Sequence, residues 1–323
     1  MNNSKTLQDR FNNDLGKLDF GKSPERLYDP IYYALSVGGK RIRPVLCLMA
    51  SELFGGNYEK TINAAFGIEI FHNFTLLHDD MMDKAEMRRG KPVVHVKWTE
   101  NIALLSGDAM SVIAYKYISE SPNNLKDLLD VFSDTALKIC EGKQYDMDFE
   151  TMSAVSEDEY LKMINLKTAV LLAASLKIGA ICANADKANS EKLYRFGENL
   201  GMAFQLQDDL LDVYGNPAVF GKNIGGDIIA NKKTYLLIKA LELANQEQHK
   251  NLNYWLNLNK FVPEEKINAV KSIYNEIGIR EYSENLMNQY FKKAFDFFDS
   301  ISIEPEKKEI LKNYTLSMKK RDY

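Results

Sequence analysis

Apolar residues return every three or four positions along most of this chain, the spacing that places them on one face of an α-helix. Runs that alternate apolar and polar residues do not recur, and no Asn-Gly or Asp-Gly pair joins two such runs into a hairpin. We therefore expect an all-α fold. The predicted helices cover residues 29–54, 60–83, 99–120, 124–142, 157–182, 188–214, 231–247, 263–276, 279–300 and 304–320.

The organisation of the chain favours a single domain over residues 1–323. Proline and glycine are scarce, at 8 and 18 residues, and no Ser/Gly-rich linker separates the helical stretches. Several predicted helices exceed the usual length of about 12 residues, as expected when helices surround a cavity. The pattern thus predicts a large helical bundle around a deep central cavity.

Composition and charge narrow the class of protein. The formal net charge is −4, and no basic stripe runs along the chain, so nucleic acid is not an expected partner. No run of 18 uncharged apolar residues and no signal-peptide pattern occurs, so we expect a soluble, cytoplasmic protein without a transmembrane segment. Cys47, Cys140 and Cys182 are widely separated within apolar runs, which predicts three core cysteines.

Two aspartate clusters of identical spacing each close a strongly apolar run: DDMMD at residues 79–83 and DDLLD at residues 208–212. In a helix, positions i and i+4 lie about 40° apart and position i+1 lies about 100° from i, so each cluster gathers its carboxylates on one side. Magnesium prefers one or two carboxylates together with waters and phosphate oxygens. Solvated acidic helix ends would explain one cluster, but two matching clusters in apolar runs indicate metal and diphosphate binding.

Basic residues stand close to both clusters. Arginine suits phosphate because its planar guanidinium donates two parallel hydrogen bonds, and glycine-rich turns expose backbone amides to anions. A lysine within an apolar helix either reaches solvent or faces a polar cavity. The candidates for anion binding are Lys40 and Arg43 after Gly38-Gly39, Arg88 and Arg89 after the first cluster, Lys167 with Thr168, and Lys222 and Lys232 after the second cluster.

Taken together, these motifs resemble the trans-isoprenyl diphosphate synthases, the family of the farnesyl and geranylgeranyl diphosphate synthases. The resemblance spans about residues 31–240 and rests on the motifs GGKRIRP, HNFTLLHDDMMDKAEMRRGKP, LKTA, FQLQDDLLD, GKNIGGD and NKKT. It implies the all-helical type I isoprenoid synthase fold and a homodimer. It also implies magnesium-dependent condensation of isopentenyl diphosphate with an allylic diphosphate, with release of pyrophosphate.

The resemblance assigns a role to each matching residue. The two clusters (Asp79, Asp80, Asp83, Asp208, Asp209 and Asp212) would bind three magnesium ions that hold the allylic diphosphate. Contacts to the same diphosphate would come from Arg88, Lys167, Gln205, Lys222 and Lys232, with Thr168 nearby, and Lys167 and Lys222 count with the aspartates as catalytic. Isopentenyl diphosphate would bind Lys40, Arg43, Arg89 and His72, which lies about 20° from Asp79 around the same helix.

Product length depends on the helix that precedes the first cluster. Phe74 and Phe71 lie about 7.5 Å and 12 Å along the helix axis from Asp79. Either ring could therefore form the closed end, or floor, of the pocket for the growing prenyl tail. Ordinary core packing is the alternative for both rings. In the family that the chain resembles, an aromatic residue at this place is typical of short-chain enzymes. Most bacterial farnesyl diphosphate synthases have two extra residues inside the first aspartate cluster, and DDMMD has none. The resemblance therefore favours a C20 product over C15.

One residue departs from the family pattern, and the C-terminal segment matches only some members. Lys143 stands where many members have glutamine, between Gly142 and Asp146. The basic tail at residues 319–323 resembles segments that close over isopentenyl diphosphate in some relatives, and a frayed tail is the alternative.

Two other functions are compatible with metal-bound aspartates in a helical cavity. A terpene cyclase normally has an Asn/Ser/Glu-type second motif and lacks a second diphosphate site, whereas this chain has DDLLD and GGKRIRP. A catalytically silent regulatory subunit would not need intact clusters, and both clusters are intact here. The motifs therefore favour the synthase.

Overall fold

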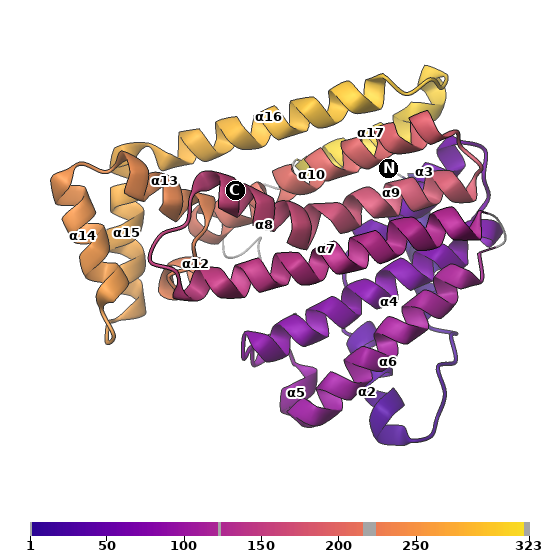
Figure 1. Ribbon diagram of the computed structural model, residues 1–323, viewed down its shortest axis with the longest axis horizontal. Coiled ribbons are helices and arrows are strands. Elements are labelled where there is room, and N and C mark those ends of the chain that lie inside the picture. The colour runs from indigo at the N-terminus through magenta and orange to yellow at the C-terminus, as the bar shows by residue number, and fades with distance from the viewer. Residues whose placement is uncertain (1, 122–123, 216–223, 320–323) are drawn as a thin grey trace. The chain divides into compact units, whose positions relative to one another are not determined.

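The computed structural model describes residues 2–121, 124–215 and 224–319, and nearly all of its regular structure is helical (Figure 1). This confirms the predicted all-α fold class. The helices group into two compact units. Unit 1 comprises Met1–Asp134, Ala174–Tyr194 and Ile301–Thr315, and unit 2 comprises Thr135–Ala173, Arg195–Ser300 and Leu316–Tyr323. A single domain over the whole chain stays a prediction.

Unit 1 is built around α4 (Tyr58–Met82), the helix that ends in the first aspartate cluster. Asn57 caps this helix by accepting a hydrogen bond from the Lys60 amide, which satisfies one of its free amides. α4 contacts α2, α3, α5 and α6, and α6 runs alongside it in Figure 1. The helices of this unit are α1 (Asn2–Leu15), α2 (Glu25–Ser36), α3 (Ile42–Leu53), α4, α5 (Val94–Lys97), α6 (Glu100–Ser119), and parts of α7 (Leu125–Thr151), α9 (Val170–Cys182), α10 (Lys187–Tyr214) and α17 (Pro305–Lys319).

A small antiparallel hairpin follows α4 directly. Its strands are β1 (Met87–Arg88) and β2 (Lys91–Pro92), and the turn between them has positive φ at Arg89 and Gly90. Two adjacent residues with positive φ are typical of the tight turns that join hairpin strands. The hairpin was not predicted, because two-residue strands are too short to produce an alternating pattern.

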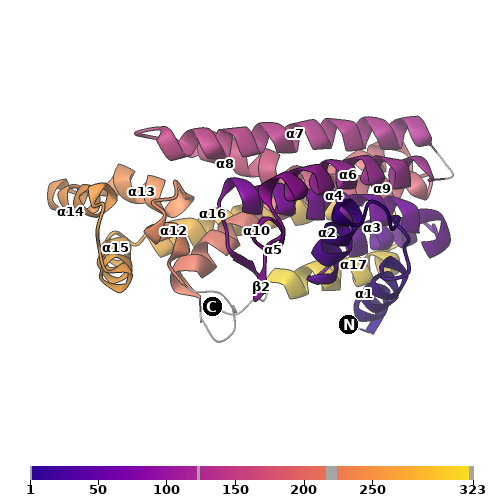
Figure 2. The same ribbon diagram turned by 90° about the horizontal axis from the view of Figure 1, so that it is seen from below.

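Unit 2 contains the second aspartate cluster near the end of α10. Its other elements are the rest of α7, α8 (Glu157–Ile164), a π-helical turn (Asn165–Ala169), α12 (Gly226–Ile229), α13 (Tyr235–Leu243), α14 (Gln246–Asn257), α15 (Pro263–Ile277) and α16 (Ile279–Asp299). Figure 2 shows α13, α14 and α15 close together, as in Figure 1, and α15 contacts both of the others. Gly278, at φ 81°, allows the chain to leave α15 and enter α16 at once.

Several boundaries differ from the sequence prediction. The expected helix over 29–54 is wrong, because the chain leaves α2 after Ser36 and takes positive φ at Gly38, Gly39 and Arg41 before α3. The expected helix over 231–247 is shorter in the structure, where α13 covers Tyr235–Leu243, and α1 and most of α14 were missed. Cys47 and Cys182 are buried as predicted, but Cys140 is exposed on α7.

One segment of the described residues is long and apolar enough to cross a membrane by length and composition alone. It covers Glu157–Cys182, and 72% of its apolar window is buried inside the protein. Core helices pass the same test, so we assign this segment to the core.

Candidate active site

The first aspartate cluster lies where α4 meets the hairpin. Asp80 is buried and accepts three hydrogen bonds from Arg88: from Nε to Oδ1 at 3.0 Å and to Oδ2 at 2.8 Å, and from Nη2 to Oδ1 at 2.7 Å. Asp79 is half-buried, whereas Asp83 is exposed at the C-terminal cap of the helix. The carboxylate of Asp80 is therefore buried against an arginine, while Asp79 and Asp83 keep more exposed surface.

Arg88 is positioned by this ion pair. Burial alone would lower the pKa of Arg88, but the hydrogen bonds and charge of Asp80 raise it above its ordinary value. The Nη1 group takes no part in the contact with Asp80. The guanidinium is thus permanently charged and held in one orientation.

Arg89 joins the hairpin to the glycine-rich loop between α2 and α3. Its Nη1 group donates a hydrogen bond to the Gly38 carbonyl. A Cβ atom at position 39 would lie 2.7 Å from Arg89 Nη1, and Gly39 has φ +145°, so glycine is required there. Lys40 follows on the same loop and is exposed. The loop and the hairpin are therefore fitted to one another.

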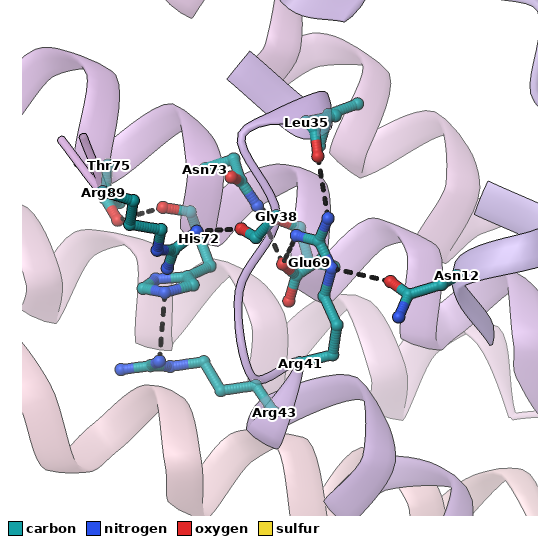
Figure 3. A network of polar contacts seen from close by, with 10 residues as sticks. All are labelled: Asn12, Leu35, Gly38, Arg41, Arg43, Glu69, His72, Asn73, Thr75 and Arg89. Carbon is teal, nitrogen blue, oxygen red and sulfur yellow. Dashed lines mark hydrogen bonds and ion pairs between the residues drawn. The ribbon is translucent and has the colours of Figure 1, made fainter. Parts of the chain in front are cut away.

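His72 lies between two guanidinium groups, those of Arg43 and Arg89, as Figure 3 shows. His72 Nε2 is 3.1 Å from Arg43 Nη1, and because a guanidinium can only donate, Nε2 accepts. The ring is then neutral, with its proton on Nδ1. Burial, together with the charges of Arg43 and Arg89, holds the pKa of His72 well below its ordinary value.

Arg43 has an unused hydrogen-bond donor in this site. Its buried Nε has no hydrogen-bond partner among the described residues, and burial lowers the pKa of the guanidinium to about 10. A buried donor without a partner is costly, and a phosphate oxygen would satisfy it. Arg43, His72 and Arg89 therefore make a suitable site for a phosphate group.

A buried ion pair holds the loop between α2 and α3 against α4. Arg41 Nη1 lies 2.5 Å from Glu69 Oε1, and Arg41 also donates to Asn12 and to the Leu35 carbonyl (Figure 3). Asn73 donates to the same Glu69 oxygen. The sequence analysis missed this network, although a glutamate inside the apolar run 66–71 was a signal that a buried partner exists.

The second aspartate cluster lies in unit 2 and is also engaged by protein groups. Asp209 is only 4% exposed and accepts hydrogen bonds from the Tyr160 hydroxyl and from Gln205 Nε2, the latter at 3.0 Å. Burial, together with the nearby charge of Asp227, raises the pKa of Asp209 to about 7. Nothing in the sequence pattern pointed to Tyr160.

The other two aspartates of this cluster are more accessible. Asp212 accepts a hydrogen bond from the Asp227 amide at 3.0 Å, which ties the end of α10 to the start of α12. Asp208 is half-buried. In both clusters, then, the second aspartate is buried against protein partners, and the first remains partly accessible.

Cations of unit 2 lie close to this cluster. Lys167 Nζ is 2.6 Å from Asp146 Oδ2, and Thr168 donates to Gln205 Oε1 at 3.0 Å. Lys232 is exposed, and its Nζ is 3.7 Å from Asp227 Oδ1. Lys222 and the tail after Lys319 lie outside the described residues.

The donor sets fit a hard divalent cation, because each cluster offers carboxylate oxygens and phosphate oxygens are the further ligands that magnesium prefers. Within residues 2–121, 124–215 and 224–319, no three His, Cys, Asp or Glu side chains form a ready-made metal site.

An aromatic cluster lies upstream of the first aspartates. The Phe74 ring is 5.2 Å from that of Phe71 and 4.7 Å from that of His78, and Phe71 packs against Phe132 at 5.1 Å. Phe71 is 2% exposed, whereas Phe74 is half-buried. Phe74 is therefore the ring of this pair with more open surface.

Comparison with known proteins decides the family. A family model described as polyprenyl synthetase matches residues 24–277. The chain belongs to the polyprenyl synthetase family. It is therefore a prenyltransferase, which confirms the prediction from the motifs, and the family is generally metal-dependent.

Individual members of this family align over most of the chain. A geranylgeranyl diphosphate synthase of Methanosarcina mazei is 38% identical over 291 residues, which cover 89% of this chain and 88% of that protein. A crystal structure of a geranylgeranyl pyrophosphate synthase matches with a TM-score of 0.94 at 43% identity and covers 100% of both chains. A polyprenyl synthase from Caulobacter crescentus, crystallised with calcium and isoprenyl diphosphate, matches with a TM-score of 0.84 at 27% identity and covers 98% of this chain and 95% of that chain.

Proposed function

We propose that this prenyltransferase condenses isopentenyl diphosphate with an allylic diphosphate, in a magnesium-dependent reaction, to give all-trans geranylgeranyl diphosphate. The observation that carries the proposal is the similarity over nearly the whole chain to proteins named geranylgeranyl diphosphate synthase. Membership of the family implies the two substrates, and the geometry of each unit supports a diphosphate site.

Unit 1 supplies the site for isopentenyl diphosphate. Arg43 offers a buried Nε donor, Arg89 a guanidinium held over the glycine-rich loop, and His72 an Nδ1–H group. Lys40 is exposed on the same loop and adds a mobile positive charge. Together these groups match the donors that a diphosphate requires.

Unit 2 supplies contacts for the diphosphate of the allylic substrate. Lys167, Gln205 and Lys232 are its expected ligands, with Thr168 hydrogen-bonded to Gln205. Lys222 is a further expected ligand and lies outside the described residues. Arg88 is expected to use its Nη1 edge for the same group, because Nε and Nη2 hold Asp80.

Six carboxylates remain the proposed magnesium ligands: Asp79, Asp80, Asp83, Asp208, Asp209 and Asp212, with three ions expected when substrate is bound. When bound, magnesium neutralises charge that develops on the leaving diphosphate. Arg88 donates to Asp80, and Tyr160 and Gln205 donate to Asp209, which fixes the orientation of these two carboxylates.

The reaction breaks the allylic C–O bond, and its electron pair leaves with the diphosphate. The double bond of isopentenyl diphosphate then attacks the allylic carbocation and forms the new C–C bond. A proton is finally lost to the released pyrophosphate. No side chain needs to act as a nucleophile, so the residues of the chain serve to bind, orient and stabilise charge.

The deciding experiment incubates purified protein with magnesium, labelled isopentenyl diphosphate and, in turn, C5, C10 and C15 allylic diphosphates. We expect elongation that stops mainly at C20 when products are separated by chromatography. A cyclic hydrocarbon would instead indicate a terpene cyclase, and the absence of turnover would indicate a silent regulatory subunit. Either result, or products that stop at C15 or continue past C20, would contradict the proposal.

The cytoplasmic location and the homodimeric state stay predictions. Exposed apolar residues on α6, Leu105 and Val112, support a homodimer. Cell fractionation and sedimentation would test the two points separately.

A further inference from the structure

Lys143 has no role in the reaction described above, yet it lies among the charged groups of unit 2. Only 9% of its surface is exposed. Its Nζ is 3.6 Å from Asp146 Oδ2, and the same oxygen accepts a hydrogen bond from Lys167 Nζ at 2.6 Å. Two ammonium groups therefore converge on one carboxylate oxygen.

The backbone holds this arrangement in place. A Cβ atom at Gly142 would lie 2.4 Å from the backbone nitrogen of Lys167, so α7 packs directly against the π-helical turn at this point. Lys143 follows Gly142, and Asp146 lies one helical turn further along. The close approach of the two backbones brings both side chains to Lys167.

The local charge favours an anion. Lys143, Lys167 and Asp146 together carry one net positive charge. Burial would raise the pKa of Asp146, but Lys167, Lys232 and Lys143 hold it below its ordinary value, so the carboxylate stays ionised at neutral pH. Lys143 and Lys167 repel one another, and an anion bound between them would reduce that repulsion.

The position of Lys143 and Lys167 in unit 2 indicates which anion they would bind. Thr168, next to Lys167, is hydrogen-bonded to Gln205, and Gln205 donates to Asp209 of the second aspartate cluster. The charge of Lys232 acts on both Asp146 and Asp209. The two lysines thus adjoin the residues proposed to bind the allylic diphosphate.

We propose that Lys143 is an additional ligand of the allylic diphosphate and of the pyrophosphate it releases, exchanging its 3.6 Å contact with Asp146 for a phosphate oxygen. The four-carbon stem of lysine is flexible, so Nζ can move from its place beside Asp146 to a phosphate oxygen. This inference rests on the proposed function.

The test titrates inorganic pyrophosphate, with and without magnesium, into the full-length wild type and three variants by calorimetry. We expect Lys143→Gln to weaken binding by about tenfold, because one charged hydrogen bond is lost. Lys143→Arg should stay within about twofold of wild type, since it keeps the charge. Lys162→Gln, an exposed lysine on α8, is the matched control and should bind as wild type does.

Steady-state kinetics give a second readout. Lys143→Gln should raise KM for the allylic substrate about tenfold and leave KM for isopentenyl diphosphate within about twofold. Equal pyrophosphate affinity in wild type and Lys143→Gln would overturn the inference, as would equal losses in the Gln and Arg variants. If the wild type elongates no substrate, the proposed function fails, and the pyrophosphate titration still decides the role of Lys143.

Discussion

At the scale of the residue, the neutral His72 ring should make the protein acid-sensitive. The unfolded chain takes up a proton at His72 near the ordinary pKa of 6.5, whereas the folded protein, with a pKa well below that value, does not. The unfolded state then binds more protons, so stability falls as pH decreases below about 6.5. We expect His72 to account for a loss of about 1 kcal/mol between pH 7 and pH 5.5.

The measurement is the free energy of unfolding by denaturant at several pH values, for wild type and His72→Gln. The variant has no ring to protonate, so its stability should decline less over the same interval. Parallel pH curves for the two proteins would show that His72 is protonated equally in the folded and unfolded states.

Phe74 provides a second prediction at this scale. It is half-buried at the edge of the aromatic cluster, whereas Phe71 is fully packed against Phe132. Phe74→Ala should open the floor of the prenyl pocket and shift the main product from C20 to longer chains, as read by chromatography. Phe74→Tyr keeps a ring and should retain the C20 product. An unchanged product from Phe74→Ala would assign the floor to other residues.

The sequence anticipated which residue types belong to the site, but not how they are paired. Spacing alone places Asp79, Asp80 and Asp83 on one side of a helix, and the structure turns Asp80 toward Arg88. Tyr160 binds Asp209 across 49 positions of sequence. Such a contact depends on how helices pack, which periodicity within one helix does not encode.

At the scale of the element, Gly142 sets the distance between α7 and the π-helical turn. A side chain there would overlap the Lys167 backbone, so Gly142→Ala should force the helices apart and destabilise the protein by about 1–3 kcal/mol. Thermal or denaturant unfolding measures this. Gly16→Ala is the matched control, because its nearest atoms would lie 3.4 Å away, and it should change stability little. Equal stability of the two variants would show that α7 can move without cost.

Element boundaries were predicted well where polar caps or glycines end a long apolar run. They were predicted poorly where tertiary contacts determine the local backbone conformation. The helix expected over 263–276 matches α15, which ends at Gly278 with positive φ. The helix expected over 157–182 is correct in extent, but its π-helical turn at Asn165–Ala169 is not visible in the apolar pattern. That turn lies against Gly142, so its geometry belongs to the packing.

At the scale of the whole molecule, the all-α class was predicted from the periodicity of apolar residues and the family from the order of the motifs. Neither prediction depends on the exact residue at which a helix begins or ends. The grouping of helices into two units was not anticipated, since it depends on contacts between segments far apart in sequence, such as Ala174–Tyr194 with Met1–Asp134. Each aspartate cluster lies in a different unit. Substitutions in the two clusters can therefore be made and compared separately, one unit at a time.

Self-association is the prediction that concerns the whole molecule. Leu105 and Val112 are 60% and 70% exposed, and their separation of seven residues places them on one face of α6. Exposed apolar side chains that line one helix face are typical of subunit interfaces, and a two-fold homodimer would bury both copies of this face. Leu105→Asp combined with Val112→Asp should therefore produce monomers in sedimentation velocity, because unpaired carboxylates are costly to bury. Val262→Asp replaces a 52% exposed residue before α15 and should sediment as the wild type does. A wild type that sediments as a monomer, or a double variant that remains dimeric, would exclude α6 as the interface.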